Sequence, residues 1–122
     1  MRISETLERM GACPEAVEWA QYKTVAEAWE SCNKEHWMKY VINYLFNNDL
    51  LTKAVWNHTN VAYFYGARMA RLYKDRRDVP WVKRITIFKS CYALRVVIPT
   101  STMQRYVTAL NKHLANLPLG RE

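Results

Sequence analysis

The longest run of helical periodicity in the chain lies at residues 49–73, a segment without proline. Apolar residues recur there at the spacing of an α-helix and occupy more than one side of it. These positions are Leu51, Val55, Ala62, Met69 and Tyr73, with Ala54, Val61, Tyr65 and Leu72 widening the stripe. Asn47 and Asn48 provide a turn before the helix, and Asp49 or a neighbouring asparagine is expected to cap its first amides. The pattern predicts a central helix that is surrounded by its neighbours.

Four further helices are expected before this segment. They cover residues 3–10, 14–20, 24–31 and 34–46. Gly11 supplies a left-handed residue that ends the first helix, and Pro14 suits the first turn of the second, where no amide hydrogen is needed. Thr24 and Glu27 form a capping box for the third helix, and Asn33 is expected to cap the fourth.

Two helices are expected after the central segment. A charged run at residues 74–78 leads into a helix that begins near Pro80 and ends at Pro99. Its apolar side consists of Trp81, Val82, Ile85, Phe88, Tyr92 and Val96. Residues 84–88 are rich in β-branched side chains, but the chain offers no second strand to pair with them. Ser101 and Gln104 form a second capping box, which opens a last helix through residue 114.

Together these patterns predict an all-α fold in a single domain, residues 1–122. We expect a compact bundle of about six helices, two short N-terminal ones followed by four longer ones around the helix at 49–73. Composition agrees with this prediction, because 3 glycines and 4 prolines are too few for a turn-rich all-β chain.

Composition also bears on localisation. No apolar run approaches the roughly 20 residues that a membrane-spanning helix needs. Residues 1–11 include acidic side chains and lack the apolar centre of a secretory signal. The 3 cysteines are odd in number and follow no spacing pattern, which suits a reducing compartment. We therefore expect a cytoplasmic protein that does not enter the membrane.

The net charge of +7 is distributed unevenly along the chain. Residues 1–61 carry 6 Lys/Arg against 8 Asp/Glu, whereas residues 62–122 carry 12 Lys/Arg against 3 Asp/Glu. A basic half of this kind attracts acidic partners. The alternative is a solvated basic face that only maintains solubility.

The basic residues concentrate at the end of the 49–73 helix and at the start of the next one. If these two helices pack antiparallel, as a short loop favours, the cations gather at one end of the bundle. The candidate partner-binding residues are Arg68, Arg71, Lys74, Arg76, Arg77, Trp81, Lys83 and Arg84. Such a patch fits an acidic protein surface or the phosphates of a nucleic acid. Asp75 and Asp78 bracket the loop arginines and favour the protein contact.

The aromatic content predicts a contact surface. With 5 Trp, 8 Tyr and 3 Phe, the chain has more rings than about six helices easily bury. Some of Trp56, Tyr63, Phe64 and Trp81 are expected at the surface. We expect either a symmetric homodimer or a partner protein to cover them.

A metal site is one candidate chemistry. Cys32 and His36 have the spacing of ligands on one helical turn, and Cys13 could lie nearby. Zinc needs four protein ligands in a structural site, and the sequence contains neither a paired-cysteine nor a paired-histidine motif. We therefore expect Cys13 and Cys32 to pack in the core as small apolar residues, with no metal bound.

A catalytic histidine is the second candidate. His58 is expected to be half-buried near the core face of the 49–73 helix, with Thr59 and Cys91 as conceivable partners. No spacing selects either partner, and the chain lacks a P-loop, a nucleophile-elbow motif and a zinc-protease motif. We expect a protein that is not an enzyme and needs no cofactor, with a small hydrolase using His58 as a minor alternative.

Residues 11–45 carry a set of motifs: Gly-Ala-Cys, then Glu-Ala with a Trp four residues on, then Ala-Trp-x-x-Cys and a Trp-Met pair before a helix. This segment resembles a family of small all-helical immunity proteins of phage and bacterial genomes, found in polymorphic-toxin loci. The strongly basic, aromatic second half departs from that family. The resemblance implies a protein that binds and neutralises another macromolecule.

The leading hypothesis is therefore a non-catalytic, phage- or mobile-element-encoded protein that inhibits a partner protein of a defence or toxin system. An immunity function or an anti-defence function, such as anti-CRISPR, would fit this description. Nonspecific nucleic-acid binding through residues 68–84 is the alternative.

Overall fold

The computed structural model describes residues 2–73 and 90–116. Over these residues the chain is all-α, as the sequence predicts, and forms a compact helical bundle without a strand. Its helices are α1 (Ile3–Arg9), α2 (Pro14–Ala20), α3 (Val25–Ser31), α4 (Glu35–Asn47), α5 (Lys53–Tyr73), α7 (Ser90–Val97) and α8 (Thr100–Ala115). No helix in this part of the chain is long and apolar enough to cross a bilayer.

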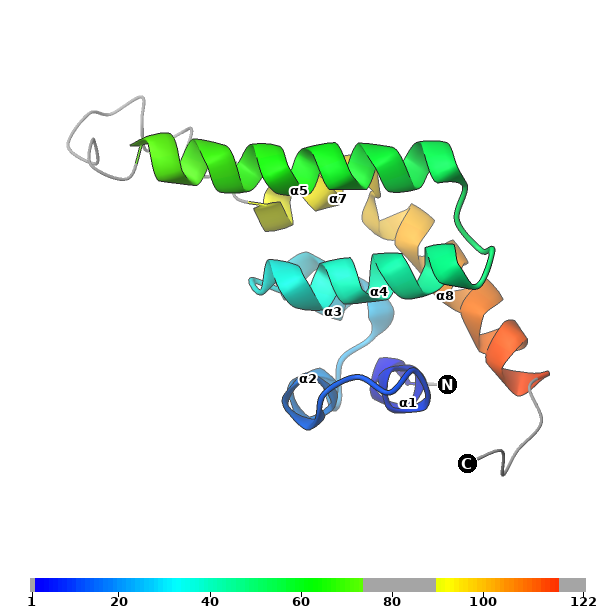
Figure 1. The fold of residues 1–122 in the computed structure, drawn as a ribbon. Coiled ribbons are helices and arrows are strands. Elements are labelled where there is room, and N and C mark those ends of the chain that lie inside the picture. Colours follow the sequence, from blue (N-terminus) through cyan, green and yellow to red (C-terminus); the bar gives the residue numbers. More distant parts are fainter. Residues whose placement is uncertain (1, 74–89, 117–122) are drawn as a thin grey trace.

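The helices are arranged around α4 (Figure 1). The long helix α5 lies along one edge of the bundle, with α7 packed against it. Helix α4 runs beside α5, and α1 and α2 pair on the other side of α4. Helix α8 descends across the bundle and packs against α3. The N-terminal helices thus pack at the end of the bundle away from α5.

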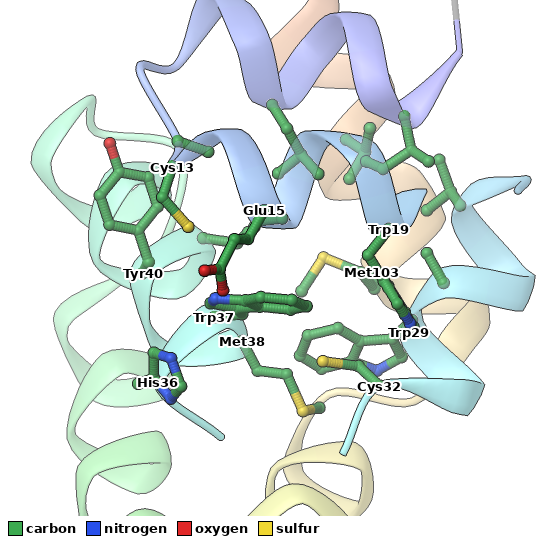
Figure 2. Close-up of a pocket in the computed structure, with 18 of the residues that line it drawn as sticks. Cys13, Glu15, Trp19, Trp29, Cys32, His36, Trp37, Met38, Tyr40 and Met103 are labelled. Carbon is green, nitrogen blue, oxygen red and sulfur yellow. The ribbon is translucent and has the colours of Figure 1, made fainter. Parts of the chain in front are cut away.

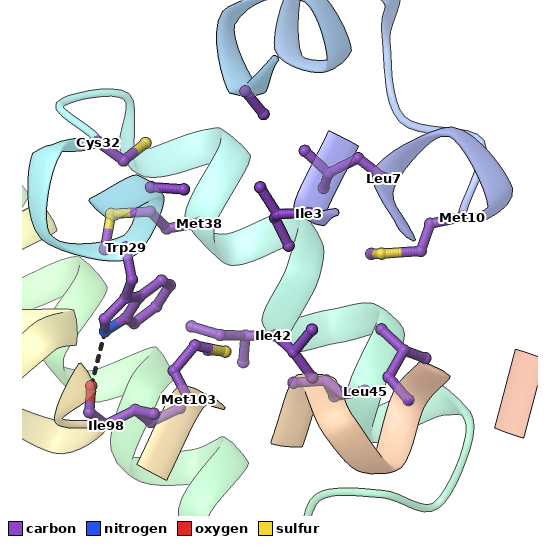
Figure 3. Close-up of a cluster of buried hydrophobic side chains, with 14 of the residues drawn as sticks. Ile3, Leu7, Met10, Trp29, Cys32, Met38, Ile42, Leu45, Ile98 and Met103 are labelled. Atoms are coloured by element: carbon purple, nitrogen blue, oxygen red, sulfur yellow. Dashed lines mark hydrogen bonds between the residues drawn. The ribbon is translucent and has the colours of Figure 1, made fainter. Parts of the chain in front are cut away.

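The core is built on α4 and α8. Ile42 and Leu45 of α4 are 0% exposed, and they face the apolar side of α8 (Figure 3). The buried residues of α8 are Met103, Val107, Leu110 and Leu114. The prediction of a surrounded central helix at 49–73 is therefore wrong in its position, because α4 occupies the centre. Helix α5 buries only the side that faces α4 and α7, and the widening positions Ala54, Val61 and Tyr65 are exposed.

Three local signals in the N-terminal half are confirmed. Gly11 has a φ of +78° and ends α1, where its N–H donates to the Glu8 carbonyl at 3.1 Å. Pro14 occupies the start of α2. Thr24 and Glu27 form the predicted capping box, with bonds of 3.1 and 3.2 Å between side chain and backbone.

Asp49 does not cap the long helix, contrary to the prediction. It has a φ of +60° and ends α4 instead, where its N–H donates to the Phe46 carbonyl at 3.1 Å and the Leu50 N–H donates to the Leu45 carbonyl at 2.9 Å. This is the left-handed helix stop in which glycine usually stands. Helix α5 starts only at Lys53, after Thr52, whose hydroxyl accepts a bond from the Val55 N–H at 3.3 Å.

Two other predicted caps are also wrong. Helix α4 is preceded by Lys34, and no side chain caps its first amides, so Asn33 does not have that role. Helix α8 begins at Thr100, directly after Pro99, which places Ser101 inside the first turn rather than before it. Pro99 lacks the N–H that would continue the preceding helix and stands instead as the residue before α8, so α8 begins two residues earlier than the capping box indicates.

Long-range hydrogen bonds connect the N-terminal helices to the C-terminal ones. The buried Trp29 indole N–H donates to the Ile98 carbonyl at 2.8 Å (Figure 3), and the Arg95 guanidinium donates to the Trp29 and Cys32 carbonyls at 3.2 and 2.9 Å. The Arg9 guanidinium donates to the Leu114 carbonyl at 2.6 Å. These bonds fix α1 and α3 against α7 and α8, and so hold the walls of the cavity described below.

Candidate functional site

The predicted basic patch is only partly covered by the structure. Arg68 is exposed on α5, and Arg71 lies near the C-terminal end of the same helix. The remaining predicted residues, Lys74, Arg76, Arg77, Trp81, Lys83 and Arg84, fall outside the described part of the chain. The gathering of these cations at one end of the bundle stays a prediction.

Arg68 belongs to an exposed, largely apolar face of α5. Val61 and Phe64 are each 68% exposed and Tyr65 is 53% exposed. Their spacing of three and four residues places them with Arg68 on one side of the helix. We call these four residues the α5 face. The sequence correctly anticipates Phe64 at the surface, whereas Trp56 and Tyr63 are half-buried.

The opposite side of α5 carries a polar seam with α4. The Thr59 side chain is fully buried; its hydroxyl donates to the Trp56 carbonyl at 2.6 Å and accepts from the Lys39 ammonium at 3.0 Å. The Trp56 indole N–H donates to Asn43 Oδ1 at 2.9 Å, and its ring stacks on Phe46 with centroids 4.5 Å apart. These contacts fix the orientation of α5, so that the α5 face points away from α4.

The same seam separates His58 from the two partners that the sequence suggests for it. Its side chain is exposed rather than half-buried as predicted, while its neighbour Thr59 points into the seam. Cys91 is buried on α7, where its thiol lies 4.0 Å from a Glu35 carboxylate oxygen. Loss of solvation, followed by the nearby charges of Cys32 and Glu35, raises the pKa of the Cys91 thiol to about 11. A thiol of this kind stays protonated near neutral pH and is a poor nucleophile.

A large cavity opens among α1, α2, α3, α4 and α8 (Figure 2). Its volume is about 810 Å³, and we call it the indole cavity because Trp19, Trp29 and Trp37 form its walls. The other lining residues are Ile3, Leu7, Gly11, Ala12, Cys13, Pro14, Glu15, Ala16, Val25, Ala28, Cys32, His36, Met38, Tyr40, Val41, Met103 and Val107. The lining thus combines three indoles with small residues from α2, α3 and the loop before α2.

The indoles are held in fixed positions. The Trp19 and Trp37 rings meet at a centroid distance of 5.7 Å and a tilt of 54°, and the His36 ring lies 6.0 Å from that of Trp37. Trp29 is anchored by its bond to Ile98. At the rim, the Tyr40 hydroxyl donates to the Met10 carbonyl at 2.8 Å and ties α4 to the loop before α2. The cavity is therefore preformed by contacts that do not involve a ligand.

The candidate metal ligands line this cavity but do not form a cluster. Among the described residues, no group of three or more His, Cys, Asp and Glu side chains is placed to hold a metal ion. Cys32 is buried, as predicted, and loss of solvation raises the pKa of its thiol. The prediction that Cys13 packs in the core is wrong, because this residue is exposed at the start of α2.

The sequence alone did not indicate the cavity. Its tryptophans and methionines follow the pattern of a filled core, and periodicity cannot distinguish a packed side chain from one that borders a void. The available signal was the concentration of small residues, Gly11, Ala12, Ala16 and Ala28, in the segment that also holds the tryptophans. Residues 11–45 supply most of the lining.

The described part of the chain thus presents two candidate binding features, the exposed α5 face and the preformed indole cavity. The first has the composition of a protein contact and the second that of a ligand pocket. No family model, no curated protein and no solved structure matches this chain.

Proposed function

We propose that this is a non-catalytic binding protein that inhibits or neutralises a partner protein of a defence or toxin system, in an immunity or anti-defence role. The observation that carries the proposal is the α5 face. There, two exposed aromatic rings, an exposed valine and an arginine share one side of α5, and another side of this helix packs against α4 and α7. Aromatic residues and arginine are the side chains that most often anchor protein interfaces.

Two further observations support this proposal. The α5 face lies on the helix that leads directly into the most basic part of the sequence, at residues 68–84. The resemblance of residues 11–45 to immunity proteins implies neutralisation by binding rather than turnover. An apolar centre beside a cationic margin fits a protein contact that is steered by charge and held by aromatic anchors.

The test is a comparison of variants in one capture experiment. The tagged chain is incubated with a nuclease-treated bacterial lysate, and bound proteins are identified by mass spectrometry. The double variant Phe64→Ala with Tyr65→Ala should lose the captured protein, with a fall in affinity of roughly thirtyfold or more if both rings are anchors. Tyr22→Ala is the matched control, because Tyr22 is an exposed aromatic residue (83%) that lies outside the α5 face.

If the double variant still captured the same lysate protein, the contact with that protein would lie outside the α5 face. Capture of nucleic acid alone from an untreated lysate, with no protein lost on substitution, would favour the nucleic-acid alternative. In that case the affinity of the chain for nucleic acid should fall steeply as the salt concentration rises, because phosphate contacts release counterions.

A further inference from the structure

The indole cavity is too large to be a packing defect. Voids in well-packed interiors rarely exceed the size of a water molecule, whereas small-molecule pockets measure roughly 300–1,000 Å³. At about 810 Å³ the cavity falls in the second class. Its walls come from five helices that are held together by buried contacts, so the space is not a gap between loosely attached elements.

The polar groups of the lining determine which ligand the cavity suits. Two of these groups already donate a hydrogen bond within the protein: the Trp29 N–H donates to the Ile98 carbonyl and the Tyr40 hydroxyl donates to the Met10 carbonyl. Glu15 is the only carboxylate among the lining residues, and it has no ion pair or hydrogen bond within the described part of the chain. Figure 2 shows its side chain directed toward the Trp37 ring. The lining therefore offers a negative charge beside an aromatic surface.

The indoles of this cavity already attract cations. The Lys23 ammonium lies 4.7 Å from the Trp19 ring centroid, and the Lys34 ammonium lies 4.9 Å from that of Trp37. Neither lysine lines the cavity. Indole has the strongest negative face among the aromatic side chains, and cages of indoles with a carboxylate suit cations that carry apolar groups. An anionic ligand inside the cavity would instead lie beside the Glu15 carboxylate, because the two ammonium groups lie outside the lining.

We propose that the indole cavity binds a small organic cation with an apolar, planar body. The body lies among Trp19, Trp29 and Trp37, and the single positive charge lies next to Glu15. This inference does not depend on the proposed partner protein, because it concerns a different surface of the chain.

The test is a charge series on one aromatic body, measured by isothermal titration calorimetry with the full chain. The three probes are (1-naphthylmethyl)trimethylammonium, neutral 1-naphthylmethanol and anionic naphthalene-1-sulfonate. We expect saturable binding of one cation per chain, about fivefold or more tighter than the neutral probe, and the weakest binding for the anion.

Two variants on α2 test whether Glu15 is the group that attracts the positive charge of the ligand. Glu15→Gln should weaken the cation about fivefold and leave the neutral probe unchanged, which shows that the cavity itself is intact. Glu18→Gln is the matched control, because Glu18 is an exposed carboxylate on the same helix that does not line the cavity. Ala12→Trp, which places a ring at a small lining position, should abolish binding of all the probes while the circular-dichroism spectrum stays helical.

Equal affinities across the series, or tightest binding of the anion, would overturn the cationic assignment. A cation affinity that Glu15→Gln leaves unchanged would overturn the role of Glu15 as the charge partner. Absence of binding by any probe at millimolar concentration would overturn the site itself.

Discussion

At the scale of single residues, environment gives the three cysteines different chemistry. Cys13 is exposed, whereas burial raises the pKa of Cys32 and raises that of Cys91 from 9.0 to about 11. Since the thiolate is the reactive form, iodoacetamide at pH 8 should modify Cys13 rapidly and the other two only after unfolding. Peptide mass spectrometry measures this directly, with Cys13→Ser as the control. Rapid labelling of Cys91 in the folded chain would contradict the burial that we describe.

The raised pKa of the Cys91 thiol also predicts that the stability of the fold depends on pH. The folded thiol ionises at a higher pH than the unfolded one, so the folded state holds its proton more tightly. The contribution of Cys91 to stability is therefore complete below about pH 9.0 and declines as the pH rises toward about 11. Urea unfolding at several pH values should show this decline in the wild type, and a smaller one in Cys91→Ala.

Backbone conformation at the two helix stops gives a second residue-scale prediction. Asp49 and Gly11 both have a positive φ, but only glycine adopts it without cost. Asp49→Gly should raise the free energy of unfolding by roughly 0.5 kcal/mol, because relief of strain exceeds the added chain entropy. Gly11→Ala should lower it by about 1 kcal/mol, since the nearest atom to a new Cβ is 3.8 Å away and only the backbone is strained. Denaturant midpoints that move in the same direction for both variants would refute this account.

At the scale of elements, α3 depends on a distant arginine for its C-terminal end. The Arg95 guanidinium of α7 bonds to the carbonyls of Trp29 and Cys32, which α3 leaves unpaired. Arg95→Met keeps the apolar stem but removes both bonds, and should lower the free energy of unfolding by roughly 1–3 kcal/mol. Arg105→Met on the exposed side of α8 is the control and should change it by less than about 0.5 kcal/mol. Equal effects of the two substitutions in urea titrations would show that the cap contributes nothing.

At the scale of the whole molecule, the α5 face predicts association of the isolated chain. Tyr92 and Val96 of α7, which packs against α5, add to the exposed apolar surface. We expect a symmetric dimer at high micromolar concentration in sedimentation velocity, and a monomer for Phe64→Asp, because a buried unpaired charge opposes the contact. A wild-type monomer at that concentration would rule out the dimer and leave the α5 face to the partner protein.

The sequence alone predicted the all-α class, the position of most helices and three of their ends. These features depend on contacts within about four residues, as in the left-handed stop at Gly11 and the capping box of Thr24 with Glu27. The spacing of apolar residues indicates which side of each helix avoids water, and this spacing was sufficient to place most of the helices.

Only the tertiary structure decided which helix is central and where a ligand could bind. The burial of α4 instead of α5 depends on contacts between distant segments, such as those of Ile42 and Leu45 with the apolar side of α8, which no local pattern encodes. Likewise, the tryptophans of residues 11–45 look like core residues in sequence, and only the packing of five helices leaves a cavity that they line together with small residues. Apolar patterning specifies the side of a helix that turns inward, while the volumes that meet there are set by the helices that arrive from elsewhere in the chain.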